Sequence, residues 1–110
     1  EIKTLREIQS SVKNHEAPTN FELSQNYPNP FNAETLVRIQ LPVQQDVTMN
    51  VFNSLGQRIF QKTKTNLAAG THTLHWNGAS AAGQPMPSGL YLIQIRTETQ
   101  VGVIKSLLVR

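Results

Sequence analysis

The chain has 110 residues, a mass of 12.3 kDa, no cysteine and a formal net charge of +3. This length fits one domain, large enough to bury a core without metals or disulfides. The ten Lys and Arg residues are scattered rather than clustered, which argues against a nucleic-acid-binding surface, and no apolar run approaches the ~20 residues of a membrane-spanning helix.

The first twenty residues differ from the rest in the spacing of their apolar residues. Apolar residues recur there at spacings of three and four, a weak amphipathic helix pattern formed by Ile2, Leu5, Ile8 and Val12. We interpret residues 1–20 as a linker from an upstream cargo protein. Because the chain starts at Glu1 without a methionine, we expect it to be a fragment from the C-terminal part of something longer.

A proline-rich stretch, "NYPNPFN", follows the linker and consists of Asn26, Tyr27, Pro28, Asn29, Pro30, Phe31 and Asn32. Each proline fixes its own φ, lacks an N–H and pushes the preceding residue toward extended conformations. We therefore predict an ordered, extended lead-in (residues 26–32) that forms a rigid seam between the linker and the domain. Tyr27 and Phe31 are expected to pin it to the core.

From residue 35 onward the apolar residues alternate with polar ones, which is typical of half-buried strands. The pattern predicts six strands at residues 35–41, 46–52, 58–63, 71–76, 90–97 and 101–109, with a short seventh around residues 21–23. Gly56 falls where a hairpin needs positive φ. Glycines and prolines in residues 77–89 indicate turns and a crossover between sheets.

Strands at this spacing, with no helix required, predict an all-β fold, an immunoglobulin-like antiparallel β-sandwich of about seven strands. The cysteine pair of antibody domains is missing, so the likeness is one of architecture. Trp76 is the expected core anchor.

Candidate catalytic groups are nearly absent. Asp46 is the only aspartate, and His72 and His75 are three apart, which on a strand places them on opposite faces and prevents them from sharing a metal. We expect no catalytic residues, no metal site, no cofactor and no enzymatic activity. The aromatic residues offer one open alternative, a sugar-binding platform, against the commoner fate of core packing; they are Tyr27, Phe52, Phe60, Trp76 and Tyr91.

Taken in order, the segments "FELSQNYPNPFNAET", "VFNSLGQRIF", "LAAGTHTLHWNG", "GQPMPSGLYLIQI" and "KSLLVR" resemble the type A C-terminal sorting domains of the type IX secretion system of Bacteroidetes and related phyla. The resemblance covers residues 21–110. Two departures are Ala33, where the family often has a proline, and Asn77-Gly78, which lacks the acidic turn residues of relatives.

The resemblance implies that the domain is a sorting signal rather than an enzyme. Such domains are recognised by the outer-membrane translocation machinery after the cargo has reached the periplasm. A sortase-like surface protease then usually cleaves them, and the cargo is released or attached to anionic lipopolysaccharide. The resemblance thus implies a secreted or cell-surface protein whose linker is the site of cleavage, since a protease engages an extended segment.

The last strand is strongly β-forming and apolar until its final residue, so we expect it to be tied into a sheet. At a sheet edge it would offer free backbone groups to a partner strand, and would also allow a weak homodimer. The residues that we predict to take part in recognition, or to support it, are Gly89, Tyr91, Lys105, Leu107, Leu108, Val109 and Arg110.

Two other functions stay open. The segment from Trp76 to "LYLIQI" also resembles the immunoglobulin-like region of flagellar hook-capping proteins, a structural role, although the lead-in and the terminal "KSLLVR" argue against it. A carbohydrate-binding accessory module would be favoured by an exposed coplanar aromatic pair.

Overall fold

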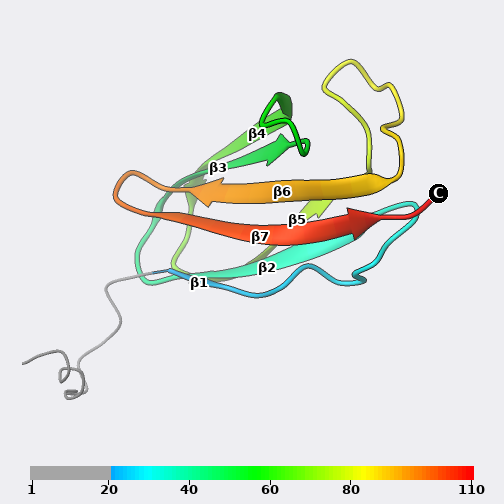
Figure 1. Cartoon of the computed structure of the whole chain (residues 1–110). Coiled ribbons are helices and arrows are strands. Elements are labelled where there is room, and N and C mark those ends of the chain that lie inside the picture. The colour runs from blue at the N-terminus through cyan, green and yellow to red at the C-terminus, as the bar shows by residue number, and fades with distance from the viewer. Residues whose placement is uncertain (1–20) are drawn as a thin grey trace, which may run out of the picture.

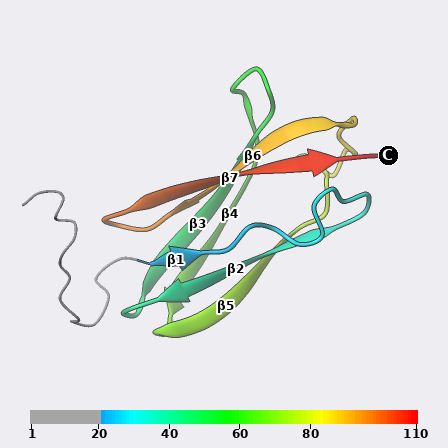
Figure 2. The same cartoon turned by 60° about the horizontal axis from the view of Figure 1, so that its bottom comes forward.

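The computed structural model describes residues 21–110; the predicted linker, residues 1–20, lies outside the described residues. Seven strands form, in chain order β1 (Glu22–Leu23), β2 (Thr35–Leu41), β3 (Gln45–Phe52), β4 (Arg58–Leu67), β5 (Gly70–Trp76), β6 (Gly89–Arg96) and β7 (Val101–Leu108). They build two antiparallel sheets, one ordered β1-β2-β5 and the other β4-β3-β6-β7. Figures 1 and 2 show the sheets as two layers. The expected immunoglobulin-like sandwich of seven strands is confirmed.

The core lies between the sheets and follows the alternation of the sequence. Apart from the first residues of β3 and β6, every second residue of β2, β3 and β6 is buried, including Ile39, Val51 and Ile93, each with no exposed surface. Burying one such side chain contributes about 1.5–3 kcal/mol, so the central strands supply most of the apolar stabilisation.

Strand β4 is longer than predicted, because it continues to Leu67 and pairs there with Gln45. A register shift between Gln45 and Val47 makes this extension possible. The carboxylate of Asp46 accepts a hydrogen bond from the Asn66 amide at 2.8 Å, and Asn66 has a left-handed φ of 55°. A polar side chain therefore extends the ladder beyond the alternating pattern.

The β3–β4 hairpin closes as predicted around Gly56, whose φ is +82°. The side-chain oxygen of Asn53 accepts hydrogen bonds from the amides of Leu55 and Gln57, both at 3.0 Å. This local network leaves Leu55 at the tip with 82% of its surface exposed.

Three aromatic rings fill the end of the sandwich where the chain terminates. Trp76 is 1% exposed and packs between Phe31 and Tyr91, with ring centroids 5.6 and 5.2 Å away. Its indole N–H donates to the carbonyl of Ala79 at 2.9 Å, so its polar atom is also satisfied. Trp76 is thus the core anchor that the sequence predicted. Residues 77–89 cross from β5 in one sheet to β6 in the other.

Candidate recognition surface at the C-terminal strand

Strand β7 lies at one edge of the four-stranded sheet, beside β6 (Figure 1). Its side chains alternate between the core and the solvent, with Ser106 and Leu108 fully buried. The exposed apolar residues of this strand, its continuation and β6, together with Lys105, form a surface that we call the β7 face: Leu90, Val101, Val103, Lys105, Leu107 and Val109.

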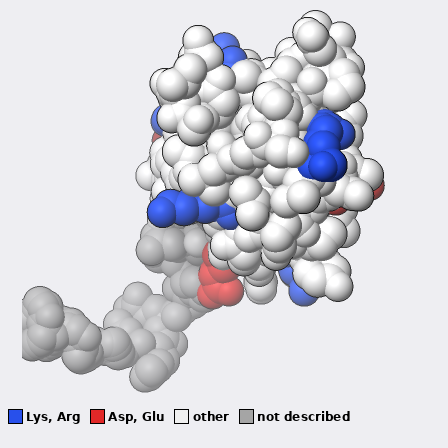
Figure 3. Space-filling model, turned by 45° about the vertical axis from the view of Figure 1, so that its right-hand side comes forward, with Lys and Arg blue, Asp and Glu red and all other residues white. Residues whose placement is uncertain are grey.

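The β7 face is unusually apolar for an outward surface. Val101, Val103, Leu107 and Val109 are 40–51% exposed, and Leu90, paired with Leu107, is 44% exposed. Exposed apolar residues that gather in one patch are typical of an interaction site, whereas isolated ones need no explanation. Lys105 lies within this patch and the exposed Arg96 of β6 pairs with Val101 at one end of it, so both contribute positive charge. On the surface shown in Figure 3 the Lys and Arg side chains are separated rather than gathered into a stripe.

The other half of the same outer sheet face is polar. Gln61 of β4 donates to Asn50 of β3 at 2.9 Å, and Asn50 donates to Gln94 of β6 at 2.9 Å. The hydroxyls of Thr48 and Thr63 are 3.0 Å apart in the next row. The apolar character of the β7 face is therefore a local property of one side of the sheet.

The lead-in covers part of the outer edge of β7. Phe31 donates its amide to the carbonyl of Leu107 at 2.9 Å, and its carbonyl accepts from the amide of Val109 at 2.8 Å. The Leu107 amide donates to the side chain of Asn29 at 2.9 Å. A partner strand therefore cannot pair with the edge around Leu107 while the lead-in is in place, so the backbone groups expected to be free at a sheet edge are already bonded there.

Asn26 joins the lead-in to both sheets. It is 2% exposed, and its amide nitrogen donates to the hydroxyls of Thr35 in β2 and Ser106 in β7, both at 2.8 Å. Gln25 donates to the side-chain oxygen of Asn26 and also to the carbonyl of Lys105 at 2.7 Å. Because buried polar groups are costly when unpaired, this network holds the lead-in in one position.

The terminal residue folds back onto residues 77–89. The Arg110 guanidinium donates to the carbonyls of Met86 and Gly78 at 2.6 and 2.7 Å, and its amide donates to the Ser88 hydroxyl at 2.8 Å. A Cβ on Gly78 would lie 3.0 Å from the Arg110 guanidinium, and Gly78 has φ +73°, so glycine suits this close approach. Arg110 is therefore held by the loop while it remains exposed.

Tyr91 supports the same loop. Its hydroxyl donates to the carbonyl of Pro87 at 2.7 Å. Burial raises the pKa of Tyr91, while the nearby Arg110 charge opposes that rise. Tyr91 is thus a neutral hydrogen-bond donor that keeps the start of β6 against the loop.

Only some of the predicted recognition residues lie on the β7 face. Lys105, Leu107 and Val109 are exposed and lie on the β7 face, whereas Tyr91 and Leu108 are buried. In the folded domain the buried pair packs in the core and cannot contact a partner. Gly89 begins β6 opposite Leu108, where it holds the loop end in register.

Within the lead-in, Phe31 packs against Trp76, but Tyr27 is 76% exposed, so the expectation that both rings would enter the core is wrong for Tyr27. The reason is backbone pairing: Tyr27 exchanges two hydrogen bonds with Leu36, at 2.8 and 2.9 Å, and this bridge turns its ring outward. Pro28, Pro30 and Asn32 are exposed.

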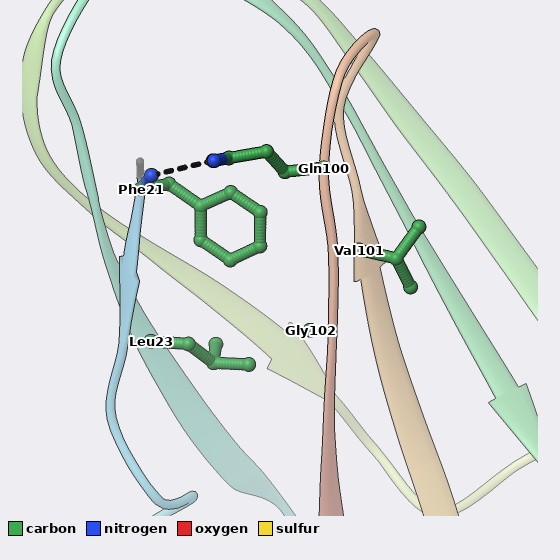
Figure 4. A pocket seen from close by; sticks show the side chains of 5 residues that line it. All are labelled: Phe21, Leu23, Gln100, Val101 and Gly102. Atoms are coloured by element: carbon green, nitrogen blue, oxygen red, sulfur yellow. Dashed lines mark hydrogen bonds between the residues drawn. The ribbon is translucent and has the colours of Figure 1, made fainter. Parts of the chain in front are cut away.

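A hollow of about 470 Å³ lies between β1 and the start of β7 (Figure 4). It is lined by Phe21, Leu23, Gln100, Val101 and Gly102. The Phe21 amide donates to the Gln100 side chain at 2.8 Å, and a Cβ on Gly102 would lie 2.9 Å from Leu23, so the glycine lets the two sheet edges approach.

Gln25 and Asn29 lie about eighty residues before their partners in β7, and their contacts with β7 were not predicted from the sequence. The only signal for them was the joint occurrence of the lead-in and the terminal strand. Both aromatic ring contacts found in residues 21–110 involve the buried Trp76, and no exposed stacked pair occurs among them. The feature named as favouring a sugar-binding module is therefore not found in this part of the chain.

Residues 21–110 contain no cluster of three or more His, Asp or Glu side chains that could hold a metal ion. The same residues include no helix of the length and apolarity needed to cross a membrane.

The fold defines the chain as an immunoglobulin-like sandwich, and the comparisons with known proteins give the family. Residues 24–100 match the FlgD Ig-like domain, so the chain belongs to that family. The match ends before β7, which leaves the candidate surface largely outside it. No curated protein matches the chain.

Solved structures resemble the domain at low sequence identity. Dimeric latent PorU from Porphyromonas gingivalis is 16% identical over 89% of this chain, with a TM-score of 0.67. PorZ, a surface component of the type IX secretion system of the same organism, is 18% identical over 82% of this chain, with a TM-score of 0.55. The matched regions make up 10% of PorU and 11% of PorZ. FlgD from P. aeruginosa is 24% identical over 68% of this chain and 60% of its own, with a TM-score of 0.56. These likenesses establish the fold.

Proposed function

We propose that this domain is a C-terminal sorting signal that directs an N-terminal cargo protein across the outer membrane through the type IX secretion system. In this proposal the translocation machinery binds the β7 face, and a sortase-like surface protease then removes the domain or uses it to attach the cargo. The protein would therefore be secreted or held at the cell surface. The domain acts as an address and has no catalytic role.

The observation that carries the proposal is the apolar β7 face. An ordinary sandwich strand at the surface presents polar side chains, as β3 and β4 do, but β7 presents valines and leucines around one lysine. The face is held in place by hydrogen bonds to the lead-in on one side and to residues 77–89 at its end. A rigid apolar surface of this kind suits docking, because little ordering is needed on binding.

The fold similarity to PorU and PorZ supports the proposal, since PorZ is a surface component of a type IX secretion system. The sequence resemblance of the lead-in and of "KSLLVR" to sorting domains supports it independently.

The test is a transport assay with three matched strains. The whole chain, residues 1–110, is fused behind a fluorescent protein that carries a periplasmic signal. This fusion is expressed in a bacterium with a working type IX system and in the same bacterium without that system. The third strain has the working system but expresses the fluorescent protein without the chain. We expect fluorescence in the medium or on the surface only when both the chain and the system are present. Periplasmic retention of the intact fusion in the working strain would contradict the proposal.

A second candidate is a structural assembly module, and the family match to the FlgD Ig-like domain is the observation that favours it. In that case the β7 face would bind a subunit of the assembly and the fusion would stay in the periplasm. The transport assay therefore separates the two functions.

A further inference from the structure

Two lysines of β4 lie on the core-facing side of the sheet at its edge, where Lys62 is exposed and Lys64 is half-buried. Lys62 pairs with Met49 and Lys64 pairs with Val47, and both partners are buried, at 2% and 1% exposure. Side chains that are directly opposite in a sheet lie on the same face, so both lysines face inward. The contact of Thr63 with Thr48 on the outer face agrees with this alternation.

Charged side chains are tolerated on this side of β4 because β4 is an edge strand. The opposite sheet has one strand fewer and leaves the edge partly uncovered. A groove of about 130 Å³ opens between β4 and β5 at this overhang. The buried Met49 and Leu74 form its apolar floor, and Lys62, Lys64 and His75 form its walls. Lysine stems can lie along such a floor while their ammonium groups reach toward water.

The positive charge of the groove is not neutralised within residues 21–110. No acidic residue lines it, and neither lysine forms a salt bridge with another described residue. Glu34 is engaged at the rim, 2.9 Å from Nδ1 of His75. Two like charges over an apolar floor concentrate a positive potential, because an apolar surface screens charge less than water does.

The size of the groove limits what it can hold. A volume of 130 Å³ corresponds to about four water molecules at ~30 Å³ each. This is room for a phosphate or carboxylate group and a few carbon atoms.

We propose that the groove between β4 and β5 binds a small oxyanion carried on an apolar stem, with Lys62 and Lys64 contacting the oxyanion and Met49 and Leu74 contacting the stem. An alkyl phosphate has this chemistry, whether as a free metabolite or as a lipid head group. The site is separate from the β7 face and does not depend on the sorting function.

A simpler role for the two lysines is protection of the edge, since inward charges prevent another strand from adding to a sheet. Edge protection requires the charges but no specific affinity for an anion and no contribution from the floor. A binding experiment with matched ligands therefore separates the two roles.

The experiment is a ¹H–¹⁵N NMR titration of the whole chain with n-butyl phosphate, inorganic phosphate and n-butanol. We expect saturable shifts of the amides of Lys62, Lys64 and Leu74 with butyl phosphate at a Kd of about 1 mM. Inorganic phosphate should bind about tenfold more weakly, because it lacks the two or so methylenes that the floor would bury. Equal affinity for the two phosphates, or no saturation by about 20 mM, overturns the proposal.

The matched variants remove two charges each. Lys62→Gln with Lys64→Gln should weaken butyl phosphate binding at least tenfold, whereas Arg58→Gln with Arg96→Gln, outside the groove, should leave it unchanged. Equal weakening in both double variants would indicate non-specific attraction and overturn the site. Circular dichroism and sedimentation check that both variants keep the fold and the oligomeric state of the parent chain.

The source of the ligand is assigned by vesicle flotation. Phosphatidylcholine vesicles with about a fifth of phosphatidic acid are compared with vesicles of phosphatidylcholine alone. Flotation that requires both the acidic lipid and the two lysines supports a lipid head group. Binding of butyl phosphate without flotation supports a free metabolite.

Discussion

The two edges of the four-stranded sheet are protected in different ways. Edge strands expose unpaired backbone groups and so risk pairing with other chains. At β4 the inner-face residues Lys62 and Lys64 place charge beside the edge, which opposes strand pairing whether or not the groove also binds an anion. At β7 the protection is backbone pairing, because the lead-in bonds to Leu107 and Val109. The lead-in therefore protects β7 from pairing with other chains while the outward side chains of β7 remain apolar and exposed.

This comparison also explains why the lead-in is so rich in proline and asparagine. The lead-in bends at residues 28–30 and 32–33, so the prediction of an extended segment is wrong there. Its prolines remove N–H donors that would otherwise need partners. The asparagines supply the side-chain bonds, Asn26 to Ser106 and Asn29 to Leu107, that backbone pairing alone does not provide. These polar contacts thereby hold the apolar strand β7 in position.

The largest effect is expected from removing the apolar anchor of the lead-in. Phe31→Ala should lower the free energy of unfolding by about 3–5 kcal/mol, because Phe31 is 2% exposed and packs on Trp76. Tyr27→Ala, in the same segment but 76% exposed, should change it by less than about 0.5 kcal/mol. Urea unfolding measures both, and similar losses would mean that the lead-in is not anchored through Phe31.

Removing the buried amide should cost less. Asn26→Ala leaves the hydroxyls of Thr35 and Ser106 without their donor, and we expect a loss of about 1–3 kcal/mol. In a double-mutant cycle with Ser106→Ala the two losses should not add, since both remove one shared bond. Strict additivity would rule out the Asn26 bridge between the lead-in and β7.

The exposed hydrogen bond between Asn29 and Leu107 should contribute least to global stability. Asn29→Ala removes the acceptor of the Leu107 amide, with an expected loss of about 0.5–1.5 kcal/mol. Hydrogen exchange of that amide should become faster, while Asn32→Ala, an exposed neighbour, should leave it unchanged. Unaltered protection in Asn29→Ala would mean that the edge is covered by other groups.

At high pH the loop that holds the terminus should weaken slightly. Because burial raises the pKa of Tyr91, the folded state keeps the phenol proton to higher pH than the unfolded state does. This contribution to stability is complete below about pH 10 and is lost as the pH rises through the folded pKa. Tyr91→Phe should remove that part of the pH dependence, and Arg110→Gln should raise the Tyr91 pKa further. Ultraviolet titration of the phenol checks both, and a lower Tyr91 pKa in Arg110→Gln would contradict the assignment.

Much of the fold could be predicted because local alternation reports burial directly. The buried faces of β2 and β3, the positive φ of Gly56 and the core position of Trp76 all follow from short-range patterns. Strand β4 was predicted too short, because its last residues depend on the Asp46 carboxylate rather than on apolar alternation.

The candidate site was predictable only in part. Alternation places Lys105, Leu107 and Val109 on one face, but the same alternation buries Leu108, which the sequence interpretation had grouped with them. The pairing of Asn29 with Leu107 joins residues 78 positions apart, and nothing local in a single sequence encodes such a contact. The return of Arg110 to residues 77–89 depends on carbonyl positions that only the folded loop defines.

The central claim is that the β7 face is the surface that the translocation machinery recognises. The direct measurement is export of the full-length fusion carrying Val103→Ser with Leu107→Ser, compared with the fusion carrying Leu55→Ser. Leu55 is an equally apolar and more exposed residue on the β3–β4 hairpin, outside the β7 face. Thermal unfolding confirms that each variant is folded. We predict that the Leu55→Ser fusion is exported like the parent, and that export of the β7-face variant falls at least about tenfold, equivalent to ~1.4 kcal/mol of lost binding. Equal export of the folded variants would contradict the account.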